Sequence, residues 1–281
     1  MVSVTSVRPR LAELRRLARS AAARRAEGVF LVEGATLGAE AVAAGLHVRE
    51  VYLEAARADE ESRVLSEQLA GTGAALVEIE AGTLAKVGAS VTPQPLLAVV
   101  ERPAVAAPES ASGEAHDDVV SFVLVAVSVA DPGNAGTLLR CAEAAGAGSV
   151  IFAGAGVDPY GPKTVRASAG SIFRLPPLLA EDPAATLEDL RGRGLRTLGA
   201  AAGRGLPYDA ADLTPPLALV VGNESHGLPA SLAGHIDEWV HVPLGGQAES
   251  LNVGAAAAVL CFEVQRRRRD APTAGGTPAD R

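Results

Sequence analysis

The chain has 281 residues, 48% of them hydrophobic, which is enough for two modest domains with packed cores. Its net charge is −8, and it shows neither a membrane-length apolar stretch nor an N-terminal signal sequence, so we expect a soluble, cytoplasmic protein. Cys141 and Cys261 lie far apart in apolar helical contexts without metal-ligand spacing, which predicts buried, reduced thiols and no metal site.

The first hundred residues alternate between helical and β-like runs. Helices are predicted at 10–25, 36–45 and near 60–70, and strands at 29–34, 48–54, 74–79 and 96–102. This alternation predicts a small α/β/α domain over residues 1–102. Residues 103–118 are rich in Pro, Ala, Ser and acidic residues without apolar periodicity, which predicts a linker.

The second half of the chain begins with a continuous apolar run at 121–130, typical of a strand that is buried on both faces of a parallel sheet. Further strands are predicted, with helices between them, at 149–154, 195–200, 217–222 and 238–244. We therefore expect a second α/β domain over residues 119–269. Residues 270–281 are short, small and polar, which predicts a disordered tail.

Arginines supply almost all of the cations and concentrate in two places. One cluster precedes the predicted tail at 266–269, and the other consists of Arg8, Arg10, Arg15, Arg16, Arg19, Arg24 and Arg25. The acidic net charge argues against a nucleic-acid binder, whereas the N-terminal cluster fits phosphate contact and a solvated helix face equally well. We take Arg15, Arg16 and Arg19 as candidate RNA-binding residues.

The sequence "DPGNAGTLLR", residues 131–140, ends the first predicted strand of the second half. Asp131, Pro132 and Gly133 break the strand, Asn134 is expected to cap the next helix, and Arg140 follows six residues later. Open α/β folds bind ligands at the carboxyl ends of their strands. Alone, however, this stretch is better described as a capped helix with one surface arginine.

Two later strands end in the same way. "LVVGNESHGLP", residues 219–229, supplies Asn223 and Glu224, and "VPLGGQAESLNVGAAAA", residues 242–258, supplies Ser250 and Asn252. Glycine-rich loops with small polar groups at three strand ends predict a pocket that is built largely of backbone.

The motifs "NAGTLLRCAEAAG", "LVVGNESHGL" and "VPLGGQAESLNVGAAAAVLCFE", in this order and spacing, resemble those of the SpoU (TrmH-like) branch of the SPOUT methyltransferases. "KTVRASAGSIFRLP" is similar to the segment between the first two motifs of that family. The stretch from "FLVEGATLGAEAV" to "VTPQPLLAVV" resembles the family's fused substrate-binding domain, a ribosomal-protein-like fold. The resemblance implies methyl transfer from S-adenosylmethionine to a ribose 2′-hydroxyl of structured RNA, a C-terminal trefoil knot in the parallel sheet, and a homodimer in which the Ala-rich last helix is a candidate contact.

The resemblance also assigns site residues. Arg140 matches the essential arginine, Glu224 matches an acid that fixes loops or Arg140, and the residues expected to orient the ribose are Asn134, Ser250 and Asn252. A guanidinium stays protonated at ordinary pH, which argues against Arg140 as a literal general base. A phosphate-bound Arg140 could still lower the effective cost of basicity or stabilise the developing alkoxide electrostatically. The implied cofactor-binding residues are Gly222, Val242 and Leu251, together with Leu244, which fits an adenine pocket and ordinary core packing equally well.

Several alternatives are open or weak. The ribosomal-protein-like domain favours ribosomal RNA, with transfer RNA as the alternative substrate and a non-catalytic RNA-binding protein as the alternative function. A serine hydrolase based on Ser225 and His226 is disfavoured because one residue too many separates Gly222 from Ser225. A dinucleotide-binding loop is disfavoured because Pro159 stands at the third glycine position.

Overall fold

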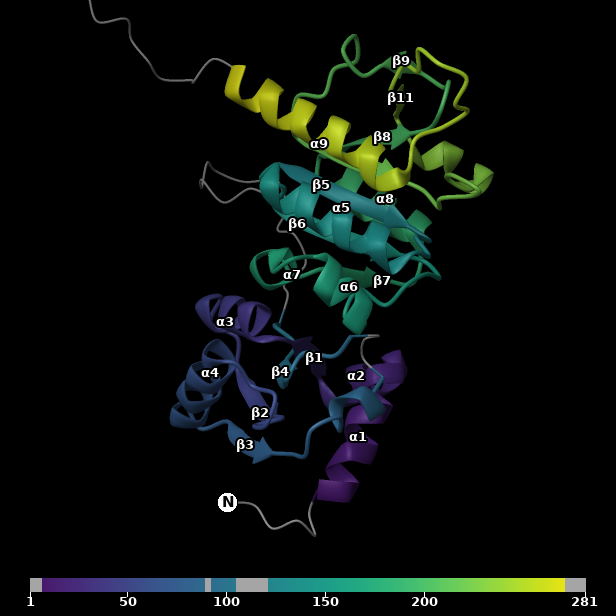
Figure 1. Ribbon diagram of the computed structural model, residues 1–281. Helices are drawn as coiled ribbons and strands as arrows, with labels where there is room; N and C mark the ends of the chain where they lie inside the picture. The colour runs from purple at the N-terminus through teal and green to yellow at the C-terminus, as the bar shows by residue number, and fades with distance from the viewer. Residues whose placement is uncertain (1–6, 89–91, 105–120, 271–281) are drawn as a thin grey trace, which may run out of the picture.

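The computed structural model describes residues 7–88, 92–104 and 121–270 and arranges them around two β-sheets (Figure 1). Most of the predicted linker and of the predicted tail lies outside the described residues. Residues 7–104 are called the N-terminal region below, and residues 121–270 the C-terminal region. Among the described helices, none combines the length and the apolar character needed to cross a membrane.

The N-terminal region contains a four-stranded sheet with helices on both faces, as predicted. Its strand order is β1-β4-β2-β3, with β1 at Val29–Glu33, β2 at Val48–Leu53, β3 at Ala75–Glu78 and β4 at Leu96–Glu101. Alternate residues of β1 face opposite sides of the sheet. Val29 and Leu31 belong to the apolar cluster of α1 (Val7–Arg19) and α2 (Ala21–Glu27), whereas Phe30 and Val32 belong to that of α3 (Ala35–Ala43) and α4 (Glu60–Gly71).

The single helix predicted at 10–25 is in fact two helices that meet at Ser20. Ser20 adopts extended backbone angles, and its hydroxyl oxygen accepts a hydrogen bond from the amide of Ala23 at 3.1 Å. A serine in this conformation is a good N-cap, because it satisfies one of the free amides at the start of a helix. The cap therefore ends α1 and begins α2.

The C-terminal region contains a seven-stranded sheet in the order β7-β6-β5-β10-β8-β11-β9, and all its neighbouring strands are parallel. The predicted strands are β5 (Phe122–Val127), β6 (Ser149–Ala153), β8 (Arg196–Ala200), β10 (Leu217–Val221) and β11 (Glu238–His241). The sequence did not predict β7 (Leu178–Ala180) and β9 (Leu206–Pro207). These two strands lie at the edges of the sheet and are too short to show a period.

Helices cover both faces of this sheet. Apolar residues of β5 and β6 pack on one face against α5 (Pro132–Ala144), α6 (Pro162–Ala167), α7 (Ser171–Arg174) and α9 (Val253–Asp270). The other face packs against α8 (Pro183–Gly192) and the short 3₁₀ helix η3 (Ala230–His235). The predicted parallel α/β architecture is confirmed, while the trefoil knot stays a prediction.

The order of the strands determines where a site can form. The chain runs outward from β5 through β6 and β7, and then crosses to the other side of β5, where β10 pairs directly with it. At such a switch point the connections that follow two neighbouring strands leave toward opposite faces of the sheet, which opens a crevice at the carboxyl ends of the strands. The first two motifs follow β5 and β10, so they border this crevice from its two sides.

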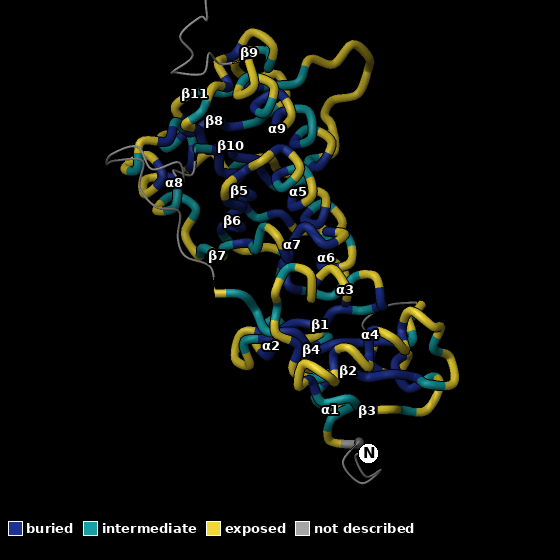
Figure 2. Tube along the Cα trace, turned by 90° about the vertical axis from the view of Figure 1, so that its left-hand side faces the viewer, coloured by how far each residue is buried: buried dark blue, intermediate teal, exposed yellow. Residues whose placement is uncertain are grey.

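The two regions pack directly against each other through β1, α6 and α7 (Figure 2). The ring of Phe30 on β1 lies 5.3 Å from that of Tyr160 and 6.1 Å from that of Phe173, measured between ring centroids. The guanidinium of Arg102 stacks over the Tyr160 ring at 4.1 Å. Because these aromatic side chains are buried, they join the two regions through a common apolar core.

Candidate active site

The first motif begins with a helix cap that differs from the predicted one. Asp131, and not Asn134, is the N-cap of α5, since its carboxylate oxygen accepts a hydrogen bond from the amide of Asn134 at 2.8 Å. Pro132 follows at the first helical position, where its missing N–H costs nothing. The predicted cap was wrong because both residue types cap helices well. Asn134 thus lies inside the first turn, and its side chain is available for other contacts.

Asn134 belongs to a hydrogen-bonded cluster that connects the three motifs. Its Nδ2 donates to the Glu224 carboxylate at 2.9 Å, and its Oδ1 accepts from Nδ2 of Asn252 at 2.8 Å. The Oδ1 of Asn252 in turn accepts from the amide of Gly254 at 2.8 Å, at the start of α9. The structure therefore brings together three of the residues that the sequence assigned to the active site.

Glu224 is the acceptor at the centre of this cluster. Besides Asn134, the amides of Ala130 and Asp131 donate to its carboxylate at 3.2 and 3.1 Å. Partial burial by itself would raise the pKa of Glu224, but these hydrogen bonds favour the charged form more strongly, so the pKa lies below its ordinary value. Glu224 is thus an ionised carboxylate that ties the loop after β10 to the loop after β5.

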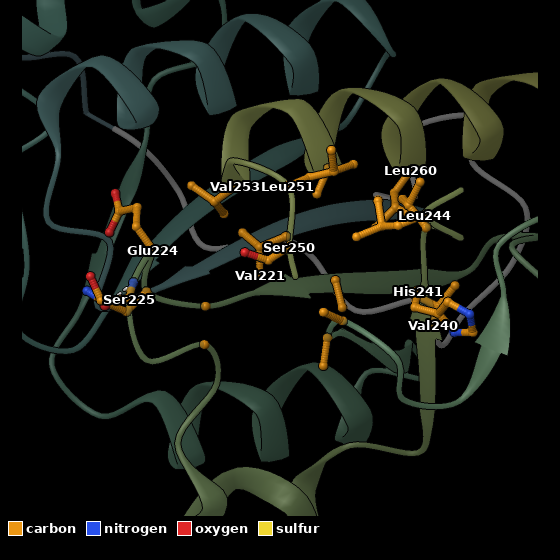
Figure 3. Close-up of a pocket in the computed structure, with 18 residues that line it drawn as sticks. Val221, Glu224, Ser225, Val240, His241, Leu244, Ser250, Leu251, Val253 and Leu260 are labelled. Atoms are coloured by element: carbon orange, nitrogen blue, oxygen red, sulfur yellow. Dashed lines mark hydrogen bonds between the residues drawn. The ribbon is translucent and has the colours of Figure 1, made fainter. Parts of the chain in front are cut away.

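A cavity of about 260 Å³ opens beside this cluster. It lies between the carboxyl ends of β8, β10 and β11 and the start of α9, and six predicted site residues line it: Gly222, Glu224, Val242, Leu244, Ser250 and Leu251. Figure 3 shows Glu224 and Ser225 at one end of the cavity and Leu244, Leu260 and His241 at the other. All four residues predicted to bind the cofactor therefore line a single pocket.

The cavity also has walls that the sequence analysis did not identify. They are Ala200–Ala202 after β8, Val240 and His241 on β11, and Val253, Ala256 and Leu260 on α9. The end of β8 could have been found, because the predicted strand at 195–200 belongs to the same parallel sheet and has its carboxyl end at the same edge. It went unnoticed because small apolar residues carry no chemical signal.

Gly222 has a structural reason to be glycine. A Cβ atom built at this position would lie 2.3 Å from the carbonyl carbon of Gly227 and 2.4 Å from the amide nitrogen of Leu228. Both distances are well inside van der Waals contact. The missing side chain therefore allows close approach of the protein's own backbone, where the sequence suggested close approach of a ligand.

The apolar walls fit the adenine ring and the methylene groups of S-adenosylmethionine. Leu244 and Leu251 are 36% and 39% exposed, so neither is an ordinary core residue. Exposed leucines at the mouth of a concave, mostly apolar cavity are typical of a small-molecule site. Leu244 therefore lines a cavity rather than filling a closed core, while its contact with adenine stays a prediction.

Arg140 is the predicted catalytic residue that the structure keeps apart. It is exposed on α5 and does not line the cavity, and its side chain makes no hydrogen bond or ion pair with any residue that the structure describes. Asn134 is in the first turn of α5, whereas Arg140 is in a later turn, so the helix itself separates the two side chains.

The N-terminal arginines have unequal surroundings. Arg16 forms ion pairs with Glu13 and Glu27, both at 2.6 Å, so its charge is already matched by two carboxylates. Arg15 donates to the main-chain carbonyl of Lys86 at 3.0 Å, which places a further cation beside the predicted cluster. Arg19 lies close to the same turn, since its guanidinium would be 3.7 Å from a Cβ at Gly88.

Comparison with known proteins gives a consistent result for both regions. Residues 121–262 match the model of the SpoU rRNA Methylase family, and residues 8–98 match the MRM3-like substrate binding domain. The chain is 33% identical over 236 residues to the 23S rRNA (guanosine(2553)-2′-O)-methyltransferase RlmP of Bacillus subtilis, covering 84% of this chain and 88% of that protein.

Solved structures agree with this relationship. An RNA 2′-O ribose methyltransferase superposes with a TM-score of 0.75 at 33% identity, covering 94% of this chain and 98% of that one. The SpoU methyltransferase AviRb from Streptomyces viridochromogenes, in complex with the cofactor AdoMet, superposes with a TM-score of 0.81 at 29% identity, covering 92% and 98%. The predicted enzyme class, an RNA ribose methyltransferase that uses S-adenosylmethionine, is confirmed. The chain belongs to the SpoU rRNA methylase family.

Proposed function

We propose that this protein methylates a ribose 2′-hydroxyl of large-subunit ribosomal RNA, with S-adenosylmethionine as methyl donor. The observation that carries the proposal is that the mostly apolar cavity lies next to the hydrogen-bonded cluster of Asn134, Glu224 and Asn252. Each of these three residues comes from a different strand-end motif. The relative from B. subtilis, named for a guanosine of 23S rRNA, aligns over both regions and supports ribosomal RNA as the substrate class.

The cofactor is held mainly by backbone and apolar surface. The loop that begins at Gly222 and the main chain near Val242 bind its polar groups, while Leu244 and Leu251 cover its apolar parts. Bound there, S-adenosylmethionine supplies an activated methyl group. All other steps fall to the side chains at the mouth of the cavity.

Methyl transfer to a neutral hydroxyl requires an aligned oxygen and a way to remove its proton. Asn134, Ser250 and Asn252 orient the ribose. Glu224 accepts three hydrogen bonds and is an anchor for these groups rather than the proton acceptor. The proton of the 2′-hydroxyl passes to solvent water as its oxygen takes up the methyl group. Arg140 stabilises the developing negative charge on the 2′-oxygen, a task suited to a group that stays protonated.

The exposed position of Arg140 is explained by a homodimer in which it completes the partner's site. Helices α5 and α9 lie side by side (Figure 1). Arg140 on α5 is exposed, and Phe262 on α9 is 46% exposed. We place the dimer contact on the exposed residues of these two helices. Mixing the inactive variants R140A and N252A then restores activity, because each mixed dimer keeps one intact site; no restoration would mean that Arg140 acts within its own chain.

RNA is bound by the cations that the protein itself leaves unmatched. Arg15 contacts the main chain of Lys86, and Arg19 lies close to Gly88, two residues further along. Arg16, by contrast, is neutralised by its two carboxylates. We therefore retain Arg15 and Arg19 as phosphate contacts, add Lys86, and assign Arg16 to the packing of α1 against α2.

The test is transfer of labelled methyl groups to unmodified total RNA, fractionated by size and mapped for alkali-resistant ribose positions. We expect label in the large ribosomal RNA, and we expect R140A to reduce turnover at least ~100-fold while S-adenosylmethionine still binds. Label in transfer RNA would contradict the substrate class. An absence of both label and cofactor binding would support the non-catalytic RNA-binding alternative.

A further inference from the structure

A buried ion pair connects the N-terminal region to the loop that follows β6. Nε and Nη2 of Arg24, on α2, donate to one carboxylate oxygen of Asp158 at 2.8 and 2.6 Å. The two side chains are only 5% and 11% exposed, although 134 residues separate them in the sequence. Arg24 also donates to the main-chain carbonyl of Leu17. Buried charges tolerate little displacement from their partners, so this contact fixes the position of Asp158.

The Asp158 loop packs directly against the loop after β5. The amide of Val157 donates to the carbonyl of Val129 at 2.8 Å. A Cβ built at Gly156 would lie 2.5 Å from the same carbonyl oxygen, so the two backbones touch without an intervening side chain. Any displacement of residues 156–158 therefore reaches residues 128–131.

Residues 128–131 carry the amides that hold Glu224. Ala130 and Asp131 donate to its carboxylate, and the carbonyl of Ser128 accepts from the Asn223 side chain at 2.9 Å. Ser128 has a φ of 52°, a left-handed conformation that is uncommon for a residue with a Cβ and must be maintained by its surroundings. This loop is consequently supported from both sides, by Val157 and by Asn223.

We propose that Arg24 is a positioning residue for methyl transfer: by holding Asp158 it fixes the loop 128–131 and, through that loop, the cluster of Glu224, Asn134 and Asn252. This inference rests on the proposed function of the cluster. It gives the N-terminal region a part in turnover as well as in RNA binding. A contact that only docked the two regions would change RNA affinity and leave turnover at saturating RNA unaltered.

A second ion pair between the regions provides a matched control. Arg174 on α7 pairs with Glu40 on α3 and with Glu143 on α5. Its partner in the N-terminal region is also 134 residues away in sequence, but the Arg174 side chain is 43% exposed. Among the described residues, no hydrogen bond or ion pair joins Arg174 to the loop 128–131.

Two measurements on the full chain test the proposal, with the variants R24Q, D158N and R174Q. The first is kcat and KM for ribosomal RNA at saturating S-adenosylmethionine. The second is native-state hydrogen exchange at the amides of Ala130 and Asp131, without RNA or cofactor. For R24Q and D158N we expect kcat to fall on the order of tenfold and both amides to exchange faster, with R24K in between; R174Q leaves both readouts at wild-type values.

The outcomes separate this inference from the proposed function, because amide exchange requires no activity. Unchanged exchange in R24Q, or a rise in KM with unchanged kcat, would overturn the positioning role. Equal losses in R174Q would overturn it too, since they would show a general effect of the interface. If R24Q fails to fold, D158N and R24K are judged by the same two measurements.

Discussion

The cavity in the C-terminal region and the cationic surface of the N-terminal region, formed by Arg15, Arg19 and Lys86, are organised in opposite ways. The cavity is built from strand ends that the fold brings to one edge of a parallel sheet, and its one carboxylate, Glu224, has three donors from the neighbouring loop and helix. In the N-terminal region, carboxylates of other helices and strands pair with arginines: Glu27 on the next helix pairs with Arg16, and Glu101 on β4 pairs with Arg49. A motif therefore identifies the residues of the cavity, whereas a count of arginines overestimates the charge that is free to bind RNA.

The cofactor cavity can be disrupted at Gly222, where the backbone of Gly227 packs against it. In G222A the added Cβ would lie 2.3 Å from the carbonyl carbon of Gly227, so the loop from Gly222 to Gly227, which lines the cavity, must shift. We expect the affinity for S-adenosylmethionine, measured by calorimetry, to fall about a hundredfold, or by about 3 kcal/mol. The control is G192A at the end of α8, where a Cβ meets no atom within 4 Å. Wild-type affinity in G222A would contradict the tight packing of this loop.

The anchoring role of Glu224 can be tested by pH. Its folded-state pKa lies below the ordinary value, so the stability that it contributes is present above the unfolded-state pKa and is lost as pH falls through the folded-state pKa. In E224Q an amide group faces donors that need an acceptor, and we expect a loss of about 2 kcal/mol in the free energy of unfolding near neutral pH.

Urea unfolding across the acidic range measures this difference between wild type and E224Q. The difference should shrink as pH falls below the usual titration range of glutamate, because the wild-type carboxylate becomes protonated and loses its advantage. A difference that stays constant with pH would show that the charge of Glu224 does not hold the loop.

How far the sequence predicts this molecule depends on the range of the interactions. The ends of parallel strands predicted a pocket with small polar groups at one edge of the sheet, and the resemblance to the SpoU motifs then assigned Asn134, Glu224 and Asn252 to it. The cap at Asp131 and the break at Ser20 were missed because one good capping residue differs from another only in whether its side chain accepts a hydrogen bond from a backbone amide of the folded chain.

The sequence could not predict which carboxylates pair with the arginines of the N-terminal cluster. Arg24 belonged to the arginine cluster on composition alone, yet it is buried against Asp158 in the other region. Arg16 was a candidate RNA contact in the sequence, and the structure pairs it with Glu27 on the next helix, so we expect less of its charge to be available to RNA. Both outcomes depend on the tertiary fold, which brings together groups with no periodic relation along the chain.

The assignment of Arg15 and Arg19 to RNA binding can be tested by comparing two sets of substitutions. R15Q with R19Q removes two proposed phosphate contacts, and we expect the slope of log affinity against log salt for ribosomal RNA to decrease in magnitude by about 1 to 2. R16Q should leave the slope unchanged, because Arg16 is already paired with Glu13 and Glu27. Equal slopes for the double variant and wild type would return Arg15 and Arg19 to a solvated helix face.

Ser20 is the N-cap of α2, and its substitution should change stability only slightly. S20A removes the acceptor for the Ala23 amide and should lower the free energy of unfolding by about 1 kcal/mol, whereas S20D keeps an acceptor and should remain near wild type. Urea unfolding of both variants checks this expectation, and equal stabilities would show that the cap does not hold α2. Arg24 lies on α2, four residues after the cap. Amide exchange at Ala130 in S20A would therefore also show whether weakening the start of α2 affects the loop that supports Glu224.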